Sequence, residues 1–327
     1  MINIFRTKNT MSVLLLLLIA FLTKIPSFIH PPIFSLHEEN GILNIFLKKH
    51  IDTSLSFSYI FLLVHYALSI TQALQLNYAV NHQRLYTQYN YLPAFIYILI
   101  LNVLPEANTL SVPFILNSVL MSILFYLLTL YDTHKPRQSI YNVGLLLGTT
   151  ILLYTPSYLY IIVLFLTLFI IRPFRIKEWI IAILGILTPY YFLATYLFLS
   201  EQKNVWVYLP NISLHNPIMS INLYNQIAIG FIIILLIIGL IYEQKHVHYM
   251  VIQIRKSWTI LIFAMFISII IPFVNKGAGN SSFAMCSLTF AAIITNAGLY
   301  FSKKTITSII CWLLLLYGML KNYIDVM

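Results

Sequence analysis

Three glutamates at the edges of apolar segments are the residues of this chain best suited to acid–base chemistry. Glu38 and Glu39 lie side by side between the first two apolar segments, and Glu106 directly follows the third. A carboxylate held beside apolar material can have its pKa raised, which suits a general base that takes a proton from a hydroxyl group. The alternative for Glu38 and Glu39 is a solvated loop, and for Glu106 it is a place in the cap of the next helix.

Two lysines in predicted loops could hold a phosphate group. Lys276 is followed by Gly277 and Gly279, and a helix is predicted to begin just after them. Glycine backbone can present N–H groups to an anion, and a helix N-terminus adds a favourable dipole. Lys203 lies in a second loop and could add positive charge. The sequence has no P-loop motif, and the alternative for the Lys276 turn is a plain connector.

Metal and cofactor chemistry is not indicated by the sequence. His246 and His248 are two residues apart, but no cysteine or carboxylate cluster completes a ligand set. Cys286 and Cys311 both lie in predicted membrane spans, where we expect them to pack as small apolar residues. Zinc-protease, nucleophile-elbow and dinucleotide-binding motifs are absent. We therefore predict no metal and no cofactor.

The composition indicates which elements must position these residues. Hydrophobic residues make up 60% of the chain and charged residues only 9%, whereas a soluble domain has about 25% charged residues. A membrane span needs about 20 mainly apolar residues, and such runs recur along the whole length. We predict an all-α, polytopic transmembrane helix bundle that forms a single integral-membrane domain over residues 1–327. About eleven spans are expected, near 12–29, 54–77, 91–105, 111–131, 140–155, 157–171, 179–199, 222–242, 258–274, 281–301 and 305–320.

Polar residues inside these spans are few. His65 and Gln72 in the second span and Asn117 in the fourth are expected to hydrogen-bond between helices. Almost no other ionisable residue is predicted deep in a span, which argues against a pump that moves ions through buried charges.

The distribution of basic residues predicts the orientation. A cytoplasmic N-terminus, with a C-terminus outside, puts most of the 19 basic residues in cytoplasmic connectors, as the positive-inside rule requires. The net charge of +10 therefore reflects contact with membrane lipids, and we expect no nucleic-acid partner. The predicted cytoplasmic residues are Arg6, Lys8, Arg84, Lys135, Arg137, Arg172, Arg175, Lys177, Lys245, Arg255, Lys256, Lys303 and Lys304.

The outer face is predicted to carry two longer loops, 30–53 and 200–221, and the short 274–282 turn. In the first loop, the apolar residues of 42–47 resemble one face of a short helix that lies in the membrane interface. Most of the acidic residues also fall on this side. If the protein does chemistry, we expect it there.

The predicted topology resembles the GT-C class of membrane glycosyltransferases. The features that carry the resemblance are the cytoplasmic N-terminus, an acid-bearing first outer loop, a second acid in the next outer turn, and a long outer loop after the seventh span. The segment 91–97 after Arg84 also looks like the start of the third span in that class. The resemblance implies a polyprenyl-phosphate-linked sugar donor at the outer face, with Glu38 or Glu39 as the first acid and Glu106 as the second. The class usually has Asp in a longer first loop, and this chain departs from it there.

A second resemblance covers the whole chain. Its richness in Ile, Leu, Tyr and Asn is similar to that of an uncharacterised multi-span membrane family of Bacteroidota. That resemblance implies a bacterial inner (cytoplasmic) membrane location and no particular activity.

The leading hypothesis is therefore a GT-C-like glycosyltransferase of envelope glycan assembly. It would bind membrane lipids, a polyprenyl-phosphate sugar donor and a glycan or lipid acceptor, with Lys276 and Lys203 at the phosphate and Glu38, Glu39 or Glu106 as the base. The alternatives are a lipid or glycolipid flippase or transporter, and a non-catalytic membrane scaffold of an envelope complex.

Overall fold

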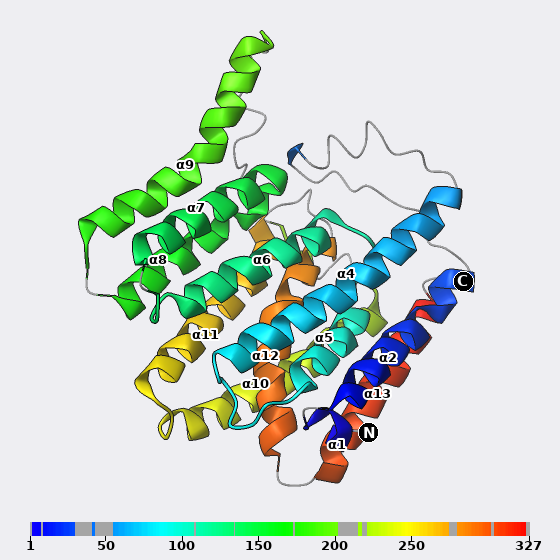
Figure 1. Ribbon diagram of the computed structural model, residues 1–327. Coiled ribbons are helices and arrows are strands. Elements are labelled where there is room, and N and C mark those ends of the chain that lie inside the picture. Colours follow the sequence, from blue (N-terminus) through cyan, green and yellow to red (C-terminus); the bar gives the residue numbers. More distant parts are fainter. Residues whose placement is uncertain are drawn as a thin grey trace.

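The computed structural model of the protein is all-helical over the residues that it describes, without any strand among them (Figure 1). These are residues 2–7, 9–29, 41–42, 55–107, 109–133, 135–172, 174–201, 215–217, 221–274, 280–301 and 304–324. The helices are α1 (Ile2–Phe5), α2 (Thr10–Ile29), α4 (Leu55–His82), α5 (Leu92–Val103), α6 (Val112–Thr129), α7 (Pro136–Leu153), η1 (Thr155–Leu159), α8 (Tyr160–Ile171), α9 (Ile176–Leu199), α10 (Leu223–Val247), α11 (Ile252–Val274), η5 (Asn280–Met285), α12 (Cys286–Tyr300) and α13 (Lys304–Ile324).

Within the described residues, eight helices are long and apolar enough to cross a membrane. They belong to α2, α4, α6, α9, α10, α11, the η5–α12 pair and α13. The protein is therefore a membrane protein. Helices also occupy the other three predicted positions, as α5, α7 and the η1–α8 pair. With 12 residues, α5 is about 18 Å long, which is shorter than a hydrocarbon core of about 30 Å.

The centre of the bundle is formed by α5 and α12. Every residue of α5 is buried, and so is α12 from Cys286 to Gly298. α5 packs against α12, α13 and α4, while α12 also packs against α10 and α11. Both helices carry buried polar side chains, such as Asn102, Ser287 and Asn296, which are costly against lipid and favour a position inside the bundle.

The contact between α7 and α9 is the most extensive one between two of the described helices. A methyl group added at Gly144 would lie 2.7 Å from the carbonyl oxygen of Ala182 and 3.1 Å from the Cα atom of Gly185. Four residues later on α7, Gly148 lies equally tightly against Ile186 and Pro189. Small residues four apart allow two helix backbones to approach in a membrane, so these glycines are required by packing.

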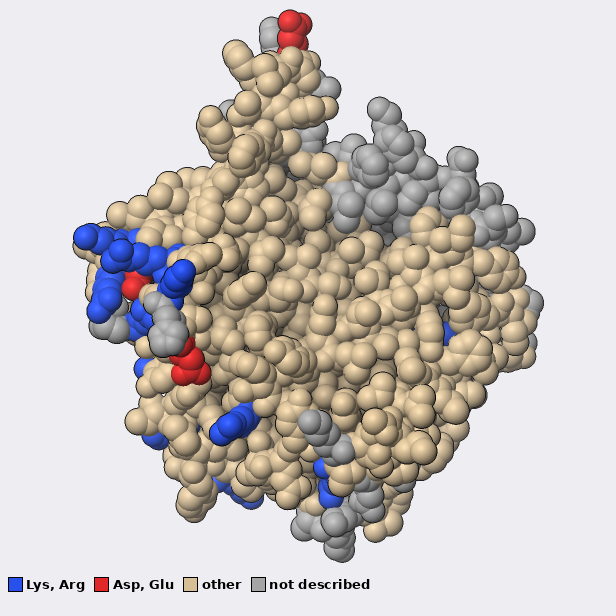
Figure 2. All heavy atoms as spheres, viewed as in Figure 1, with Lys and Arg blue, Asp and Glu red and all other residues tan. Residues whose placement is uncertain are grey.

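Basic residues gather at one end of the bundle. In Figure 1, α2 and α13 run side by side from the lower end of the bundle to its upper end. The connectors α6–α7, α8–α9 and α10–α11 lie along the lower and left edge (Figure 1). Lys and Arg gather at that edge in Figure 2, whereas the middle of the face is nearly free of charge. A membrane protein that obeys the positive-inside rule has this distribution.

Several helices extend beyond their predicted ends. α4 continues to His82, α10 to Val247 and α13 to Ile324, where the sequence predicts ends at 77, 242 and 320. The added turns contain polar residues. Such residues end an apolar run in the sequence, but the helix itself continues through them. Glu243 and Lys321 lie in these turns and are buried, whereas the sequence places both in connectors. The predicted 140–155 and 157–171 helices are joined by the tight η1 turn.

Candidate functional site

Two lysines are buried on neighbouring helices near the upper end of the bundle. Lys24 on α2 is 3% exposed and Lys321 on α13 is 2% exposed. The two helices are packed together. A hydrogen bond from Asn322 Nδ2 to the carbonyl oxygen of Thr23, 2.6 Å long, fixes the register of the helices. Two basic side chains are thereby placed inside a low-dielectric region.

Lys321 also hydrogen-bonds to the C-terminal end of α5. Its Nζ atom donates to the carbonyl oxygens of Leu104 at 2.5 Å and Val103 at 3.3 Å. The last carbonyl groups of a helix lack partners within that helix, and a cation near them interacts favourably with the helix dipole. This contact gives Lys321 a structural role and explains how its charge is kept in place.

His65 on α4 adds a third basic group. Its side chain is fully buried, stacks on Phe114 with ring centroids 4.2 Å apart, and lies within electrostatic range of Lys24. Its Nε2 atom is 3.1 Å from the carbonyl oxygen of Ala107, so Nε2 is the donor. In neutral imidazole the other nitrogen is then an acceptor. Nδ1 is buried and has no hydrogen-bond partner among the residues that the structure describes, which leaves this acceptor available to a hydroxyl group.

Glu106 lies in the same turn. Residues 103–107 form a turn, here called the 103–107 turn. Lys321 hydrogen-bonds to carbonyl oxygens at the start of this turn, and His65 hydrogen-bonds to the carbonyl oxygen at its end. Glu106 is half-buried, and its Oε1 atom accepts a hydrogen bond from Asn280 Nδ2 at 3.2 Å. Its φ of +51° is unfavourable for a side chain with a Cβ atom, and strained residues of this kind cluster at functional sites.

The interior hydrogen bonds predicted from sequence are present below this turn. Gln72 Nε2 donates to the carbonyl oxygen of Phe114 at 2.8 Å, and Tyr97 OH donates to Gln72 Oε1 at 2.6 Å. Asn117 Nδ2 donates to the carbonyl oxygen of Ala284 at 2.8 Å. These bonds join α4, α5, α6 and η5, so they hold the helices that carry His65 and Glu106 in fixed positions.

The other predicted site residues lie outside the described residues. These are Glu38, Glu39, Lys203 and Lys276. Of the predicted set, Glu106 is therefore the one whose surroundings are known. The sequence prediction did not include Lys24 and Lys321 in the site, because each lies at the edge of an apolar run and reads as a flanking charge. The available signal was that the apolar run continues beyond Lys24 to Ile29.

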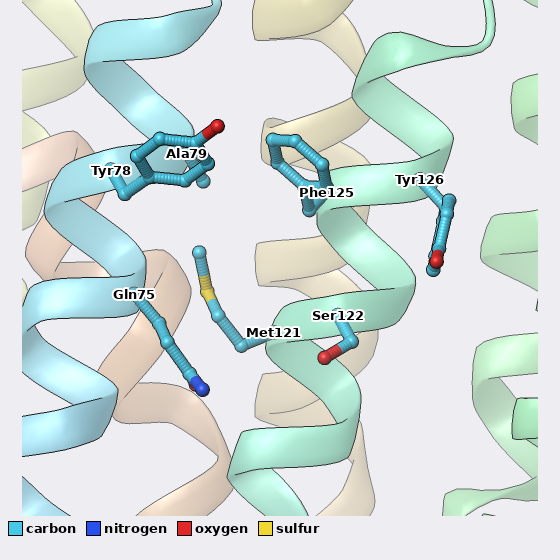
Figure 3. Close-up of a pocket in the computed structure, with 7 residues that line it drawn as sticks. All are labelled: Gln75, Tyr78, Ala79, Met121, Ser122, Phe125 and Tyr126. Carbon is cyan, nitrogen blue, oxygen red and sulfur yellow. The ribbon is translucent and has the colours of Figure 1, made fainter.

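A separate cavity of about 190 Å³ lies between α4 and α6 (Figure 3). Gln75, Tyr78, Ser122, Phe125 and Tyr126 are among its lining residues, and Figure 3 shows Gln75 and Met121 extending into the space between the two helices. Gln75 is ten residues beyond His65 on α4, or about 15 Å along the helix. This cavity therefore does not belong to the Lys24–Lys321 site.

Metal ligands are not gathered anywhere in the described part of the chain: no group of three or more His, Cys, Asp or Glu side chains there could hold a metal ion. His246 stacks on Tyr300 with ring centroids 3.9 Å apart, and its Nδ1 atom lies 2.8 Å from the carbonyl oxygen of Tyr242. Glu178 pairs with Arg172 at 3.4 Å and Arg175 at 3.9 Å. These contacts account for the polar residues near the lower end.

Most of the chain matches the model of a known family. Residues 41–326 match a family of unknown function, DUF6427. The chain belongs to this family. No protein of curated function and no solved structure matches the chain significantly. The matched region includes His65, the 103–107 turn and Lys321, whereas Lys24 lies before it.

Proposed function

We propose that this DUF6427 protein is a GT-C-like transferase of bacterial envelope glycan assembly that uses a polyprenyl-phosphate-linked sugar at the outer face of the inner membrane. In this proposal the chain crosses the membrane eleven times, with its N-terminus in the cytoplasm and its C-terminus outside. The upper end of the bundle is then the outer end. The shorter α5 and η1–α8 segments cross because neighbouring helices enclose them.

The observation that carries the proposal is the position of Lys321 at the end of α5, with Glu106 in the turn that follows and Lys24 on the neighbouring helix α2. An ammonium group can donate charge-assisted hydrogen bonds to a phosphate, which offers several acceptor oxygens. A carboxylate in the adjoining turn supplies the acid–base group that transfer to a hydroxyl requires. Lys276 and Lys203 remain proposed as additional phosphate ligands, and Glu38 and Glu39 as alternative bases.

The reaction follows from these roles. The phosphate of the donor lies against Lys24 and Lys321, and a second hydroxyl of the acceptor, next to the attacking one, donates a hydrogen bond to His65 Nδ1. Glu106, Glu38 or Glu39 takes the hydroxyl proton as the oxygen attacks the anomeric carbon. The bond from that carbon to the phosphate oxygen breaks, and the polyprenyl phosphate leaves with the bonding electrons, stabilised by the lysines.

The test is sugar transfer by purified protein reconstituted in vesicles. Replacement of a general base lowers the rate by about 10²–10⁴-fold, so one of Glu106→Gln, Glu38→Gln or Glu39→Gln is expected to do so. Glu243→Gln, at the opposite end of the bundle, is the matched control and should retain full activity. If all three variants transfer as well as the unaltered protein, the transferase function is wrong.

The buried lysines also support a second candidate, a lipid flippase. The sequence predicts few ionisable groups inside the spans, but Lys24 and Lys321 lie within helices and are buried. Buried charges in membrane spans often mark the path of a substrate. A flippase needs no carboxylate base, so it would move a fluorescent lipid phosphate across vesicles with Glu106→Gln but not with Lys321→Met.

A further inference from the structure

The cavity of about 190 Å³ between α4 and α6 carries polar groups on the lipid-facing side of the bundle. Gln75 and Tyr78 on α4 and Tyr126 on α6 line it and are exposed. Gln75 lies seven residues before the end of α4, and Ser122 seven residues before the end of α6, which is about 10 Å along each helix. Half of a hydrocarbon core is about 15 Å thick. These polar groups therefore lie at the depth of the lipid chains.

Gln75 can donate hydrogen bonds that its neighbours do not accept. Neither its amide nor the hydroxyl group of Tyr78 is hydrogen-bonded to another residue that the structure describes. The hydroxyl group of Ser122 donates to the carbonyl oxygen of Ser118 at 3.1 Å, so its oxygen can only accept. An amide without a partner is costly in a hydrocarbon surrounding. The pocket therefore suits a ligand that brings its own acceptor atoms.

Aromatic rings form one end of the same pocket. Figure 3 shows Tyr78 and Phe125 pointing towards each other, and their ring centroids are 5.7 Å apart. His82 adds a third ring, 5.6 Å from each of them. Aromatic side chains favour stacked or edge-to-face contacts with another ring. A cavity of about 150 Å³ can hold benzene, so this pocket has room for one six-membered ring with its substituent oxygens.

We propose that the pocket between α4 and α6 binds a lipid-soluble quinone, with its ring against Tyr78 and Phe125 and a carbonyl oxygen accepting a hydrogen bond from Gln75 Nε2. The two carbonyl oxygens of a quinone match the two donors, Gln75 and Tyr78, which lie three residues apart on one helix face. None of the seven lining residues is charged, which disfavours a phosphate headgroup. A sugar is disfavoured because its many hydroxyl groups would lack partners at this depth. The inference concerns binding alone and is independent of sugar transfer.

The first experiment compares two substitutions on α4. Binding of a radiolabelled benzoquinone with a ten-carbon tail to the full chain in detergent is expected to weaken about three- to tenfold in Gln75→Leu, the loss of one hydrogen bond. This variant should fold as well as the unaltered protein, because it removes a polar group from lipid. Thr71→Leu is the matched control: Thr71 is exposed one turn earlier, does not line the pocket and bonds to its own helix. Equal affinity of the two variants would overturn the inference.

Photolabelling makes the test independent of any variant. An azidobenzoquinone with the same tail, bound to the unaltered chain and illuminated, should label the 75–79 and 121–126 segments, as mapped by mass spectrometry. Labelling spread over the exposed side chains of other helices, such as α9, would mean that the quinone only dissolves in the surrounding detergent. That outcome would overturn the inference.

Competing lipids separate the quinone ring from its tail. Unlabelled benzoquinone with the ten-carbon tail should displace the radiolabelled ligand, whereas squalene, a hydrocarbon without ring or carbonyl group, should not. Phosphatidylglycerol, which brings a charged headgroup, should not displace it either. If squalene or phosphatidylglycerol competed as well as the quinone, the pocket would be a general contact surface for lipid and the inference would be wrong.

Discussion

Lys321 donates a hydrogen bond of 2.5 Å to the carbonyl oxygen of Leu104, a residue 217 positions earlier in the chain. The last helix thus fixes the end of the central helix α5, from which the 103–107 turn continues. Because α13 also packs against α2, which carries Lys24, one side chain both completes the fold and contributes to the proposed phosphate site.

Phosphate binding should stabilise the protein through Lys24. A ligand that binds the folded protein at 100 times its dissociation constant adds about 2.7 kcal/mol of stability. We expect polyprenyl phosphate to raise the thermal midpoint of the unaltered protein and of Lys256→Met, a variant at the lower end. Lys24→Met should lose this shift when measured by thermal unfolding in detergent. A shift of unchanged size in Lys24→Met would exclude that lysine from the site.

His65 should act through one ring nitrogen for stability and the other for substrate. His65→Phe keeps the ring beside Phe114 but leaves the carbonyl oxygen of Ala107 without its donor. The expected loss is about 1–3 kcal/mol of unfolding free energy, measured by denaturant titration. His65→Gln can restore a donor, so recovered stability without recovered transfer would assign Nδ1 to the substrate. Recovery of both would leave His65 a purely structural residue.

The close α7–α9 contact predicts a sharp difference between two glycines. Gly144→Val forces side-chain atoms against the backbone of α9 and should destabilise the protein by about 1–3 kcal/mol. Gly230→Val faces open space and should change stability by less than about 0.5 kcal/mol. Thermal unfolding of the two variants in the same detergent compares them directly. Similar losses at both positions would show that helix propensity, not contact, sets the cost.

The orientation can be tested with cysteines. Both native cysteines are buried, so background labelling by an impermeant reagent should be low. In intact cells we expect Asn204→Cys and Ala278→Cys to be labelled from outside, while Lys135→Cys and Arg255→Cys stay unlabelled until the membrane is opened. Labelling of position 135 in intact cells would invert the proposed topology.

The pattern of apolar segments was sufficient to predict where helices occur, because each run of that length must satisfy its backbone hydrogen bonds internally in a membrane. Helix ends were predicted less well. Hydropathy falls at the first polar residue, as at Glu243 and Lys321, but a helix continues where neighbouring helices enclose that residue. Gln72 and Asn117 were correctly expected to bond between helices.

The candidate site was predicted only in part. Glu106 was identified because an acid beside a predicted span is conspicuous. Lys24 and Lys321 were not, because their proximity depends on α2 and α13, from opposite ends of the chain, packing side by side (Figure 1). No local pattern encodes that contact. His65 was expected only to hydrogen-bond, and the free acceptor at Nδ1 depends on which atom faces Ala107.

The depth of Lys24 has an electrical consequence. It lies five residues before the end of α2, or about 8 Å along the helix, which is about a quarter of a 30 Å hydrocarbon core. A charge that crosses the whole membrane gains or loses about 2.3 kcal/mol per 100 mV, so an anion that reaches Lys24 from the end of α2 would change in energy by about 0.6 kcal/mol per 100 mV. The fraction of sites that hold an anion would then depend on the membrane voltage. It would differ between a cell with a membrane potential and a depolarised cell.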